Sequence, residues 1–399
     1  MKKLFIIGQI PKEYGGSYTT GVANVIIELA DVLKDDFDIY LYATNYKDTK
    51  VKENYGFKIL GYSYTKFIKL IILQLVKNPL LLVKLYKEFN NEFGIPPVKF
   101  ILNHLLLRYY IDKLKPEIIN AHGIVFSPLL KNLKNSAKVF FTFHGLMYDD
   151  DNSIKANKKR GIDVYKLYNN GAKYIDNPIY LTEEMKIKGE YDLKIESKQS
   201  YIIPNGVNVA KFRFCETSRD ELRVKFGVND NELIFISVGA LTNRKNHIGF
   251  IKYLIKNDFK GQYWIIGKFE AEQTKQQILE YQKSIKDFKI RIFDYVTHET
   301  LYKYYSAADI YAHPSTSEGQ ALVVFESLCC GLPVLVNEEI KGTVSVGENY
   351  TKSVIFINLK EQRILPEFNI DREKLSLKCK TDFNWNEIGN LYKNVFTNE

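Results

Sequence analysis

The sequence predicts an α/β protein with two doubly wound parallel-sheet domains that face a central cleft. The chain has 399 residues, which exceeds what a single hydrophobic core usually serves. Short apolar runs alternate with helix-like segments almost throughout, and this βαβ rhythm is typical of parallel sheets covered on both faces. The series of strands starts again after Pro204-Asn205-Gly206, without a low-complexity linker. Ligands of such sheets bind at the carboxyl ends of the strands, so a site between the two domains is expected.

Each half contributes its own series of strands. In the first half, a strand at 3–8 precedes a glycine-rich loop and a helix whose apolar residues recur at helical spacing from Val22 to Leu33. Further strands are expected there at 37–45, 117–122, 138–145, 177–182 and 200–206. In the second half, strands are expected at 232–239, 261–267, 289–296, 308–315, 332–338 and 353–358. The predicted domains are therefore 1–203 and 204–381.

Composition limits the classes of partner. The formal net charge of +9 favours anionic partners, such as phosphates or an acidic membrane surface. Nucleic-acid binding is not expected, because no basic-aromatic module accompanies that charge. The six histidines are scattered and the four cysteines show no CxxC spacing. No metal site is therefore expected, and the cysteines are predicted to be reduced, buried and inert.

A cytoplasmic location is expected, with peripheral membrane contact as an option. The first apolar stretch is too short for the core of a signal peptide, and the lipophilic segment 69–86 is interrupted by Lys77, Asn78 and Pro79. If 66–77 is helical, lysines fall on one side and apolar residues cover the rest, as in helices that lie on an anionic membrane. The alternative is a helix buried in the first domain with its lysines at the rim.

The first half places glycines and histidines where strands end. The connection at 8–25 contains Gly15 and Gly16, and glycines let the backbone approach a ligand closely, while a helix start suits an anion. A plain glycine turn is the alternative. His122 and His144 each follow a strand of the same sheet, so a site role for at least one of them stands beside a structural role for both.

The second half places cations after its first strand. Arg244 and Lys245 lie in the loop at 238–246, where a guanidinium fork and an ammonium would suit phosphate oxygens. The alternative interpretation is a solvated basic loop.

Two glutamates bracket the apolar run at 317–326. Glu318 is expected at a strand end, just before a helix whose first N–H groups, near 319–321, favour a phosphate. Glu326 lies among apolar residues one helix later, and an unpaired buried carboxylate costs on the order of several kcal/mol, so it needs donors. A vicinal diol such as that of a ribose would supply two. An exposed edge position paired with a lysine is the alternative.

Together these residues resemble the retaining glycosyltransferases of the family 4 type, which have the two-Rossmann-domain architecture called GT-B. Glu318 and Glu326 match the E-x7-E motif of that family. The supporting elements are PNGV at 204–207, a VG-x-L-x3-KN element ending at Asn246, and GLPV at 331–334. The resemblance extends over nearly the whole chain, and its specificity comes from the order and spacing of these elements.

The resemblance implies a role for each matching residue. Glu326 would bind the ribose of a nucleotide-sugar, and Glu318 would face the transferred sugar. Gly15 and Gly16 would approach the donor from the opposite domain, while Lys245 would hold the diphosphate. The other residues implied in donor binding are Asn205, Gly239, Arg244, Gly319, Gln320, Ala321 and Leu322.

The resemblance also implies catalytic candidates and a domain crossing. His122 would lie near the sugar or the incoming hydroxyl, with His144 nearby. Glu318, Lys245 and Arg244 complete the catalytic set with His122. The last helix, about 382–399, would cross back to the first domain.

The implied activity is retaining hexosyl transfer to a hydroxyl of a glycan, a lipid-linked intermediate or a protein. A UDP-sugar is the favoured donor, and no metal or other cofactor is expected. Two departures from the family pattern concern Ala240, where arginine is common, and Gln320-Ala321, where the family has Phe-Gly beside the sugar. The alternatives are a UDP-sugar 2-epimerase-type enzyme on the same fold and a non-catalytic binding scaffold.

Overall fold

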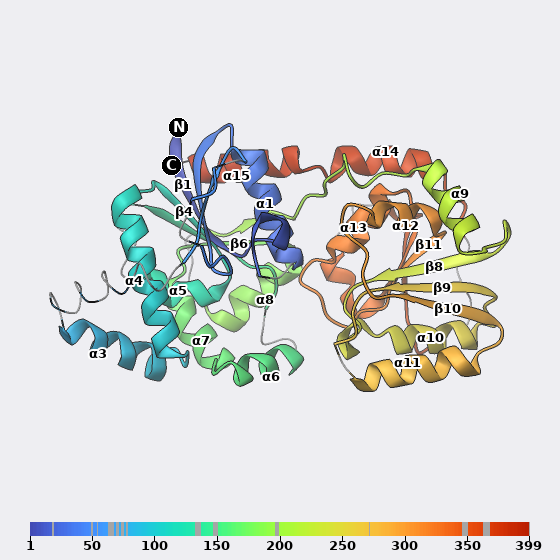
Figure 1. Ribbon diagram of the computed structural model, residues 1–399, viewed down its shortest axis with the longest axis horizontal. Helices are drawn as coiled ribbons and strands as arrows, with labels where there is room; N and C mark the ends of the chain where they lie inside the picture. The colour runs from blue at the N-terminus through green and yellow to red at the C-terminus, as the bar shows by residue number, and fades with distance from the viewer. Residues whose placement is uncertain are drawn as a thin grey trace. The chain divides into compact units, whose positions relative to one another are not determined.

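The protein is described by a computed structural model with two compact units (Figure 1). Unit 1 comprises Met1–Asn205 and Ile388–Glu399, and unit 2 comprises Gly206–Glu387. The sequence analysis placed these boundaries at 203/204 and at about 382. The structure describes residues 1–17, 20–48, 51–53, 55–62, 68, 72, 76, 79–131, 137–146, 151–195, 199–270, 272–344, 350–361 and 368–398.

Unit 1 is built on a seven-stranded parallel sheet in the order β3-β2-β1-β4-β5-β6-β7. Its strands are β1 Lys2–Gly8, β2 Phe37–Ala43, β3 Lys58–Leu60, β4 Ile118–His122, β5 Lys138–Thr142, β6 Asn177–Tyr180 and β7 Tyr201–Ile202. The strand order reverses between β1 and β4, as in a doubly wound sheet. The short strand β3 was not predicted, because only three residues of it are extended.

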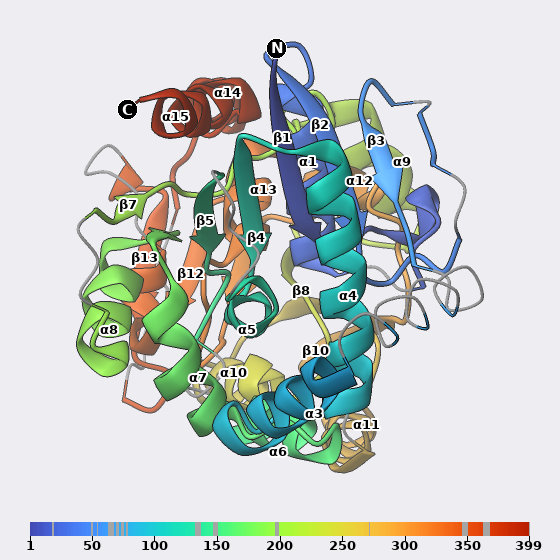
Figure 2. The same cartoon turned by 90° about the vertical axis from the view of Figure 1, so that its left-hand side faces the viewer.

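Helices surround the sheet of unit 1 (Figure 2). They are α1 Gly21–Leu33, α3 Pro79–Lys87, α4 Pro97–Leu114, α5 Ser127–Leu130, α6 Asp151–Lys159, α7 Val164–Gly171 and α8 Glu183–Leu193. Single turns add η1 Lys12–Tyr14, η2 Glu88–Glu92, η3 Ile124–Phe126 and η5 Ala172–Tyr174. Thr20 caps α1 by accepting a hydrogen bond from the Ala23 N–H, which explains where that helix begins.

The last helix, α15 Trp385–Thr397, completes unit 1 from Ile388 onward. Phe396 packs its ring against Phe37 of β2 and Phe140 of β5, at centroid distances of 6.1 Å and 4.9 Å. Lys393 forms an ion pair with Asp36. The core of the N-terminal unit therefore contains residues from the very end of the chain.

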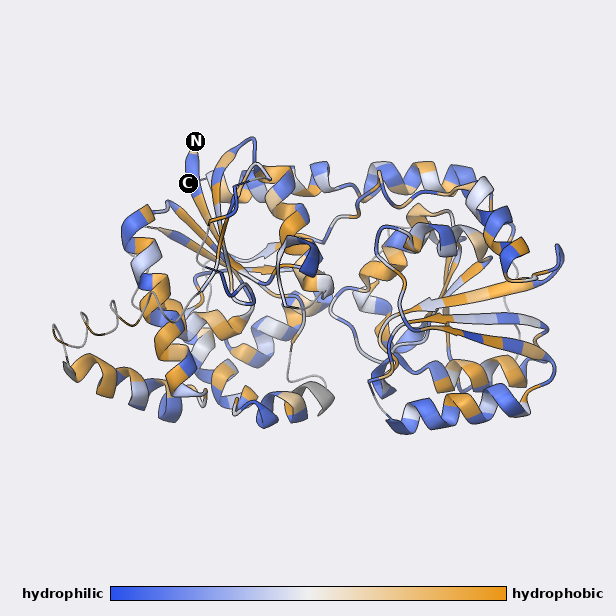
Figure 3. Ribbon diagram, viewed as in Figure 1, coloured by the Kyte–Doolittle hydropathy of each residue, from blue (hydrophilic) through white to orange (hydrophobic). Residues whose placement is uncertain are grey.

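Unit 2 holds a six-stranded parallel sheet in the order β10-β9-β8-β11-β12-β13. Its strands are β8 Leu233–Val238, β9 Gly261–Ile266, β10 Phe288–Phe293, β11 Ile310–His313, β12 Val334–Asn337 and β13 Val354–Ile357. Most of their side chains are buried, which is why these strands are continuous apolar runs rather than alternating ones (Figure 3). The six strands expected in this half are all present.

The helices of unit 2 contribute buried apolar residues to the cores around this sheet. They are α9 Glu216–Lys225, α10 His247–Lys256, α11 Glu272–Ser284, α12 Leu301–Ala307, α13 Leu322–Cys329 and α14 Arg372–Asp382, with the turns η6 Asn243–Lys245 and η7 Glu338–Thr343. Both units thus have the Rossmann-like arrangement that the sequence predicted.

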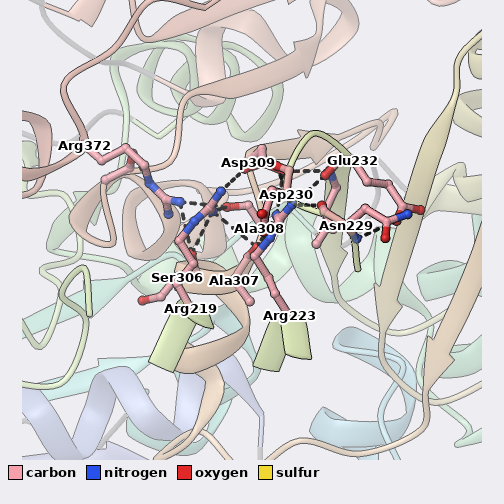
Figure 4. Close-up of polar contacts among 12 residues, drawn as sticks. Arg219, Arg223, Asn229, Asp230, Glu232, Ser306, Ala307, Ala308, Asp309 and Arg372 are labelled. Atoms are coloured by element: carbon pink, nitrogen blue, oxygen red, sulfur yellow. Dashed lines mark hydrogen bonds and ion pairs between the residues drawn. The ribbon is translucent and has the colours of Figure 1, made fainter. Parts of the chain in front are cut away.

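An arginine cluster fixes the C-terminal end of α12 (Figure 4). Arg219 and Arg223 of α9 bind the two carboxylate oxygens of Asp309 at 2.7 Å and 3.1 Å. Arg372, at the start of α14, donates to the carbonyls of Ser306 and Ala308 at 3.0 Å and 2.9 Å. Burial lowers the pKa of Arg372 to about 10. The unpaired carbonyls at a helix end are thereby satisfied, and α9 and α14 are joined to α12.

The cysteine prediction needs one correction. Cys329, Cys330 and Cys379 are free and buried, as expected. Cys215 is only half-buried, and its hydrogen bond to Ser218 lowers the pKa of the thiol. The prediction of a buried thiol was therefore wrong for Cys215, which lies at the start of α9.

The described residues of the lipophilic segment 69–86 are in part exposed and in part buried, because Leu85 is 4% exposed and Leu81 and Leu82 pack against the core of unit 1. Ile68, Ile72 and Val76 are helical and exposed, whereas the three lysines expected on one side of 66–77 lie outside the described residues. Most residues of 66–77 lie outside the described part of the chain, so the alternative of a helix buried in the first domain stays a prediction. Within the described part of the chain, no helix combines the length and the apolar character needed to cross a bilayer.

Candidate active site

Glu318 is the centre of a cluster of cations in unit 2. The Nζ atom of Lys245 lies 2.6 Å from Oε1 of Glu318, and Nη1 of Arg244 lies 3.0 Å from Oε2. The Ser315 hydroxyl donates to Oε1 at 2.6 Å. The two basic residues are therefore directed at the glutamate, so the interpretation as a solvated basic loop was wrong.

The local backbone explains why these groups meet. Arg244 and Lys245 lie in η6, after β8, while Glu318 follows β11, and these two strands are neighbours in the sheet. Asn246 ends η6 in a left-handed conformation and caps α10 by accepting from the Gly249 N–H. Gly239 has a φ of 146°, and a Cβ there would lie 3.1 Å from Cε of Lys245. Glycine at this position therefore makes room for the lysine side chain.

His313 adds an imidazole to the cluster that the sequence analysis missed. Its Nε2 atom lies 3.3 Å from Oε1 of Glu318, and its Nδ1 atom is 3.1 Å from the Tyr311 hydroxyl. Burial lowers the pKa of His313, so this ring is neutral at neutral pH. His313 is the last residue of β11. The rule that singled out His122 and His144, a histidine at a strand end, would have found it.

Opposing effects act on the Glu318 carboxyl. Burial alone would raise its pKa, but Lys245, His313 and Arg244 outweigh that effect and hold the pKa well below its ordinary value. The carboxylate is therefore ionised throughout the neutral range. In this state it neutralises cations that would otherwise be free to bind an anion.

Glu326 forms a second, separate cluster on α13. Its side chain is 3% exposed; Oε1 lies 3.1 Å from Nε2 of His298, and Oε2 accepts from the Tyr305 hydroxyl at 3.4 Å. The need for donors was predicted, whereas the alternative of an exposed edge with a lysine partner was wrong. His298 lies in the loop before α12, and no periodicity in the sequence points to it.

The helix α13 begins slightly later than expected. Its first residue is Leu322, and Ala321 occupies the N-cap without a side-chain cap. The Leu322 N–H already donates to the Gln320 carbonyl at 2.9 Å. The N–H of Leu322, one of the residues implied in donor binding, is thus engaged within the loop, while Gly319, Gln320 and Ala321 lead into the helix.

In unit 1, the glycine loop is held by an asparagine that was not predicted. The side chain of Asn45 binds both the N–H and the carbonyl of Ile10, at 2.9 Å and 2.7 Å. Gly15 has a φ of 98°, and a Cβ on Gly16 would lie 1.9 Å from the Ile10 carbonyl oxygen. These glycines are therefore required by the loop itself. Asn205, also expected at the site, is buried and is the last residue of unit 1 before unit 2 begins.

His122 and His144 are in direct contact in unit 1. The Nδ1 atom of His122 lies 2.8 Å from Nε2 of His144, and the two rings stack with centroids 5.1 Å apart. His122 is 6% exposed at the end of β4, and His144 is part-exposed after β5. Burial lowers the pKa of His144 to about 4 and that of His122 well below its ordinary value. Both imidazoles are neutral at neutral pH.

Two Rossmann-like units with charged and polar side chains at their strand ends define the GT-B class of architecture. Family comparisons agree with this assignment. Residues 19–211 match the family described as "Glycosyltransferase Family 4", and residues 218–364 match "Glycosyl transferases group 1". Together the two matches extend over most of the chain. The chain belongs to the family 4 type of GT-B glycosyltransferases.

Curated relatives match parts of the chain. A UDP-Gal:alpha-D-GlcNAc-diphosphoundecaprenol alpha-1,3-galactosyltransferase of Escherichia coli is 25% identical over 61% of this chain and 63% of its own length. An alpha-monoglucosyldiacylglycerol synthase of Streptococcus pneumoniae is 29% identical over 40% of this chain and 39% of its own. The match thus spans less than two thirds of the length of either relative.

Solved structures match over the full length. A sucrose-phosphate synthase from Thermosynechococcus elongatus superposes with a TM-score of 0.70 at 15% identity, covering 99% of both chains. The structure of Anabaena Alr3699/HepE in complex with UDP superposes with a TM-score of 0.67 at 13% identity, covering 100% of both chains. At these identities the likeness establishes the fold.

Proposed function

We propose that this protein is a retaining glycosyltransferase that moves a hexose from a UDP-sugar to a hydroxyl of a lipid-linked or glycolipid acceptor. The observation on which the proposal depends is the convergence of Lys245 and Arg244 on Glu318. In this arrangement two cations and the first glutamate of the E-x7-E motif occupy one small region, together with the turn at Gly319–Ala321. Glycan and protein hydroxyls remain the other acceptor classes to compare.

The chemistry assigned to these residues is stabilisation of the leaving group. Negative charge develops on the nucleotide diphosphate as the glycosidic bond breaks, and a donor fixed in advance toward such charge is typically worth about 10²–10³ in rate. Lys245 and Arg244 would exchange their ion pairs with Glu318 for ion pairs with the diphosphate. Glu318 would then be free to accept a hydrogen bond from a sugar hydroxyl. Because fixed cations serve the diphosphate, the proposal includes no metal ion.

Support for the nucleotide and the acceptor comes from related proteins. The name of the E. coli relative specifies a UDP-sugar donor and an undecaprenol-linked acceptor, and the S. pneumoniae relative is named for a glucosylated diacylglycerol. The Anabaena protein was solved with UDP and with UDP-glucose. Glu326 would bind the ribose in the place where His298 and Tyr305 now hold its carboxylate.

A nucleotide screen followed by a transfer assay tests this function. UDP, GDP, ADP and CMP are compared by thermal shift, because a ligand that binds only the folded state stabilises it by RT ln(1 + [L]/Kd), which increases with affinity. The matching nucleotide-sugar is then incubated with lipid acceptors in the presence of EDTA, and the anomeric configuration of the product is read by NMR. Inversion, or loss of turnover in EDTA, would contradict the corresponding part of the proposal.

The same experiments separate the two rival functions. A 2-epimerase-type enzyme would convert the nucleotide-sugar with no acceptor present, which an NMR time course of the donor alone would detect. A non-catalytic scaffold would bind none of the four nucleotides.

An exposed apolar face of unit 1 supports contact with a membrane. The side chains of α3 and of the segment before it that face solvent are Ile68 (53% exposed), Ile72 (53%), Val76 (80%), Leu80 (76%) and Val83 (54%). Leu80 and Val83 are three residues apart in α3, so they lie on the same side of that helix. Lys84 and Lys87 are exposed on α3 as well, and this helix is coloured largely as hydrophobic in Figure 3.

A basic helix adds charge at the same edge of unit 1. The exposed residues Lys155, Lys158, Lys159 and Arg160 belong to or follow α6, and both views place α6 at the edge that carries α3 (Figures 1 and 2). Apolar side chains beside lysines suit an anionic bilayer surface, where each basic residue contributes about 1 kcal/mol. We therefore propose peripheral binding through α3, which would bring the enzyme to a lipid-linked acceptor.

Co-sedimentation with anionic vesicles tests the membrane contact. Leu80→Glu/Val83→Glu is expected to weaken binding to phosphatidylglycerol vesicles at low salt by about tenfold or more, because two apolar groups are replaced by anions. Val224→Glu, at an equally exposed site (81%) on α9 of unit 2, is the matched control. Equal binding of the double variant and the control would contradict the assignment.

A further inference from the structure

Five polar side chains of unit 1 form one continuous series of hydrogen bonds. The Tyr392 hydroxyl of α15 is bonded to the Thr142 side chain, and Thr142 Oγ1 donates to Oδ1 of Asn120 at 3.0 Å. Nδ2 of Asn120 lies 3.3 Å from Nε2 of His122. Nδ1 of His122 then lies 2.8 Å from Nε2 of His144. The series therefore runs from the last helix to the histidines at the strand ends.

The buried end of the series sets its direction. Tyr392 is 1% exposed and its hydroxyl is bonded to the Thr142 side chain; because Thr142 donates its own proton to Oδ1 of Asn120, its Oγ1 atom can only accept from the phenol. The amide nitrogen of Asn120 consequently faces Nε2 of His122 as a donor.

The direction continues through both imidazoles. Because Nε2 of His122 accepts from Asn120, the neutral ring must carry its proton on Nδ1. That proton is donated to Nε2 of His144, so the neutral His144 must also carry its proton on Nδ1. Each ring therefore uses its only lone pair inside the series, and neither has a free nitrogen to act as a base.

We infer that the series Tyr392–Thr142–Asn120–His122–His144 is a directed relay that makes the Nδ1–H of His144 the hydrogen-bond donor offered by unit 1 to a substrate oxygen. That the oxygen belongs to a transferred sugar or an acceptor hydroxyl rests on the proposed function. His144 is the more exposed of the two rings, and in the described part of the chain its one hydrogen bond is to His122. His122, Asn120, Thr142 and Tyr392 are positioning residues in this assignment.

The histidine tautomers test the relay directly in the free protein. With selective ¹⁵N-histidine labelling of the full chain, six imidazole rings are expected, each with an Nδ1 and an Nε2 signal, and His122→Gln and His144→Gln assign two of the rings. Both rings are expected to be protonated at Nδ1 near neutral pH. Asn120→Asp should invert the pattern, because a carboxylate only accepts and would demand an Nε2–H on His122. An Nε2–H tautomer of either ring in the unmodified protein would overturn the inference.

Paired substitutions test the donor by kinetics. In His144→Asn the amide nitrogen lies near the position of Nδ1, whereas in His144→Gln it lies near Nε2, so His144→Gln is expected to lower kcat/KM by about tenfold more than His144→Asn. Tyr392→Phe removes the first donor of the relay, and Tyr180→Phe is its control, because the buried Tyr180 hydroxyl has no partner among the described residues. Equal rates for the two His144 variants would refute the assigned donor.

These outcomes distinguish the relay from the proposed function. The tautomers are read without substrate, so they decide the relay whether or not sugar transfer is found. Transfer activity in a protein with Nε2–H histidines would refute the relay and leave the proposed function standing.

Discussion

The ammonium of Lys245 and the carboxylate of Glu318 lie 2.6 Å apart, although 73 positions separate them in the sequence. The pair forms because η6 follows β8 and the Glu318 turn follows β11, and β8 and β11 are adjacent parallel strands. An anion that binds Lys245 must therefore compete with a carboxylate that is already in place.

Replacement of Lys245 tests the leaving-group assignment. Lys245→Ala is expected to lower kcat by about 10²–10³, because a fixed donor toward the developing charge is lost. The measurement is steady-state transfer with saturating acceptor. Lys275→Ala, which removes an exposed lysine of α11, should retain the activity of the unmodified protein. Full activity of Lys245→Ala would contradict the assignment.

The second glutamate is expected to affect binding of the nucleotide more than turnover. Glu326→Gln keeps the shape of the side chain but removes the charge toward His298, and hydrogen bonds to charged groups are worth about 1.5–3 kcal/mol. The Kd for UDP, measured by calorimetry, should therefore rise by roughly tenfold or more. Glu272→Gln on the exposed face of α11 is the control. An unchanged Kd would argue against ribose binding at this position.

His247 should make the protein sensitive to mild acid. Burial lowers the pKa of this side chain to about 3, against an ordinary value near 6.5. Between these values the unfolded chain binds a proton that the folded chain does not, so the free energy of unfolding falls as the pH decreases from about 6.5 toward 3. Above pH about 6.5 the imidazole is neutral in both the folded and the unfolded state, so His247 no longer lowers the free energy of unfolding.

Denaturant unfolding across this pH range provides the measurement. His247→Gln cannot titrate, so its free energy of unfolding should decline less steeply than that of the unmodified protein. The other titrating groups are common to both proteins and cancel in the difference. Parallel pH profiles would show that His247 does not titrate as the structure implies.

We expect that disrupting the arginine cluster around Asp309 lowers the stability of unit 2 without a direct effect on catalysis. Asp309→Asn would leave Arg219 and Arg223 without their carboxylate in a largely buried region, which typically costs about 3–5 kcal/mol. Urea unfolding measures this loss. Asp230→Asn is the control, because the exposed Asp230 contributes only its backbone carbonyl to Arg223. A loss similar to that of the control would mean that the cluster is not a major support of unit 2.

Much of the fold could be predicted because buried parallel strands leave a strong local signal. Continuous apolar runs such as 233–238 and 261–266 are readable in the sequence, and polar residues directly after them fall at one edge of a sheet. This is why Lys245 and Glu318 could be assigned to one region before their ion pair was known. Strand β3 was missed because three residues carry too little pattern.

Partners chosen by tertiary packing could not be predicted. His298 contacts Glu326 from a loop that has no periodic sequence pattern. Asn45, which follows β2, binds the backbone of Ile10, which follows the neighbouring strand β1. Asn120 and Thr142 lie inside apolar strands, where a single polar residue gives no sign of its neighbour. Sequence patterns place an element on a sheet, but they do not state which side chain a buried donor will meet.

The packing of Phe396 on Phe37 and Phe140 has a consequence for synthesis on the ribosome. Translation is vectorial, so residues 1–205 emerge long before Phe396 and Lys393 are made. Unit 2 can assemble as soon as its own residues have been released, whereas unit 1 keeps apolar surface around Phe37 and Phe140 uncovered until Phe396 has left the ribosome. The unit that begins the polypeptide is therefore the last to reach its native state, and a premature stop codon anywhere in α15 would damage the N-terminal half of the protein.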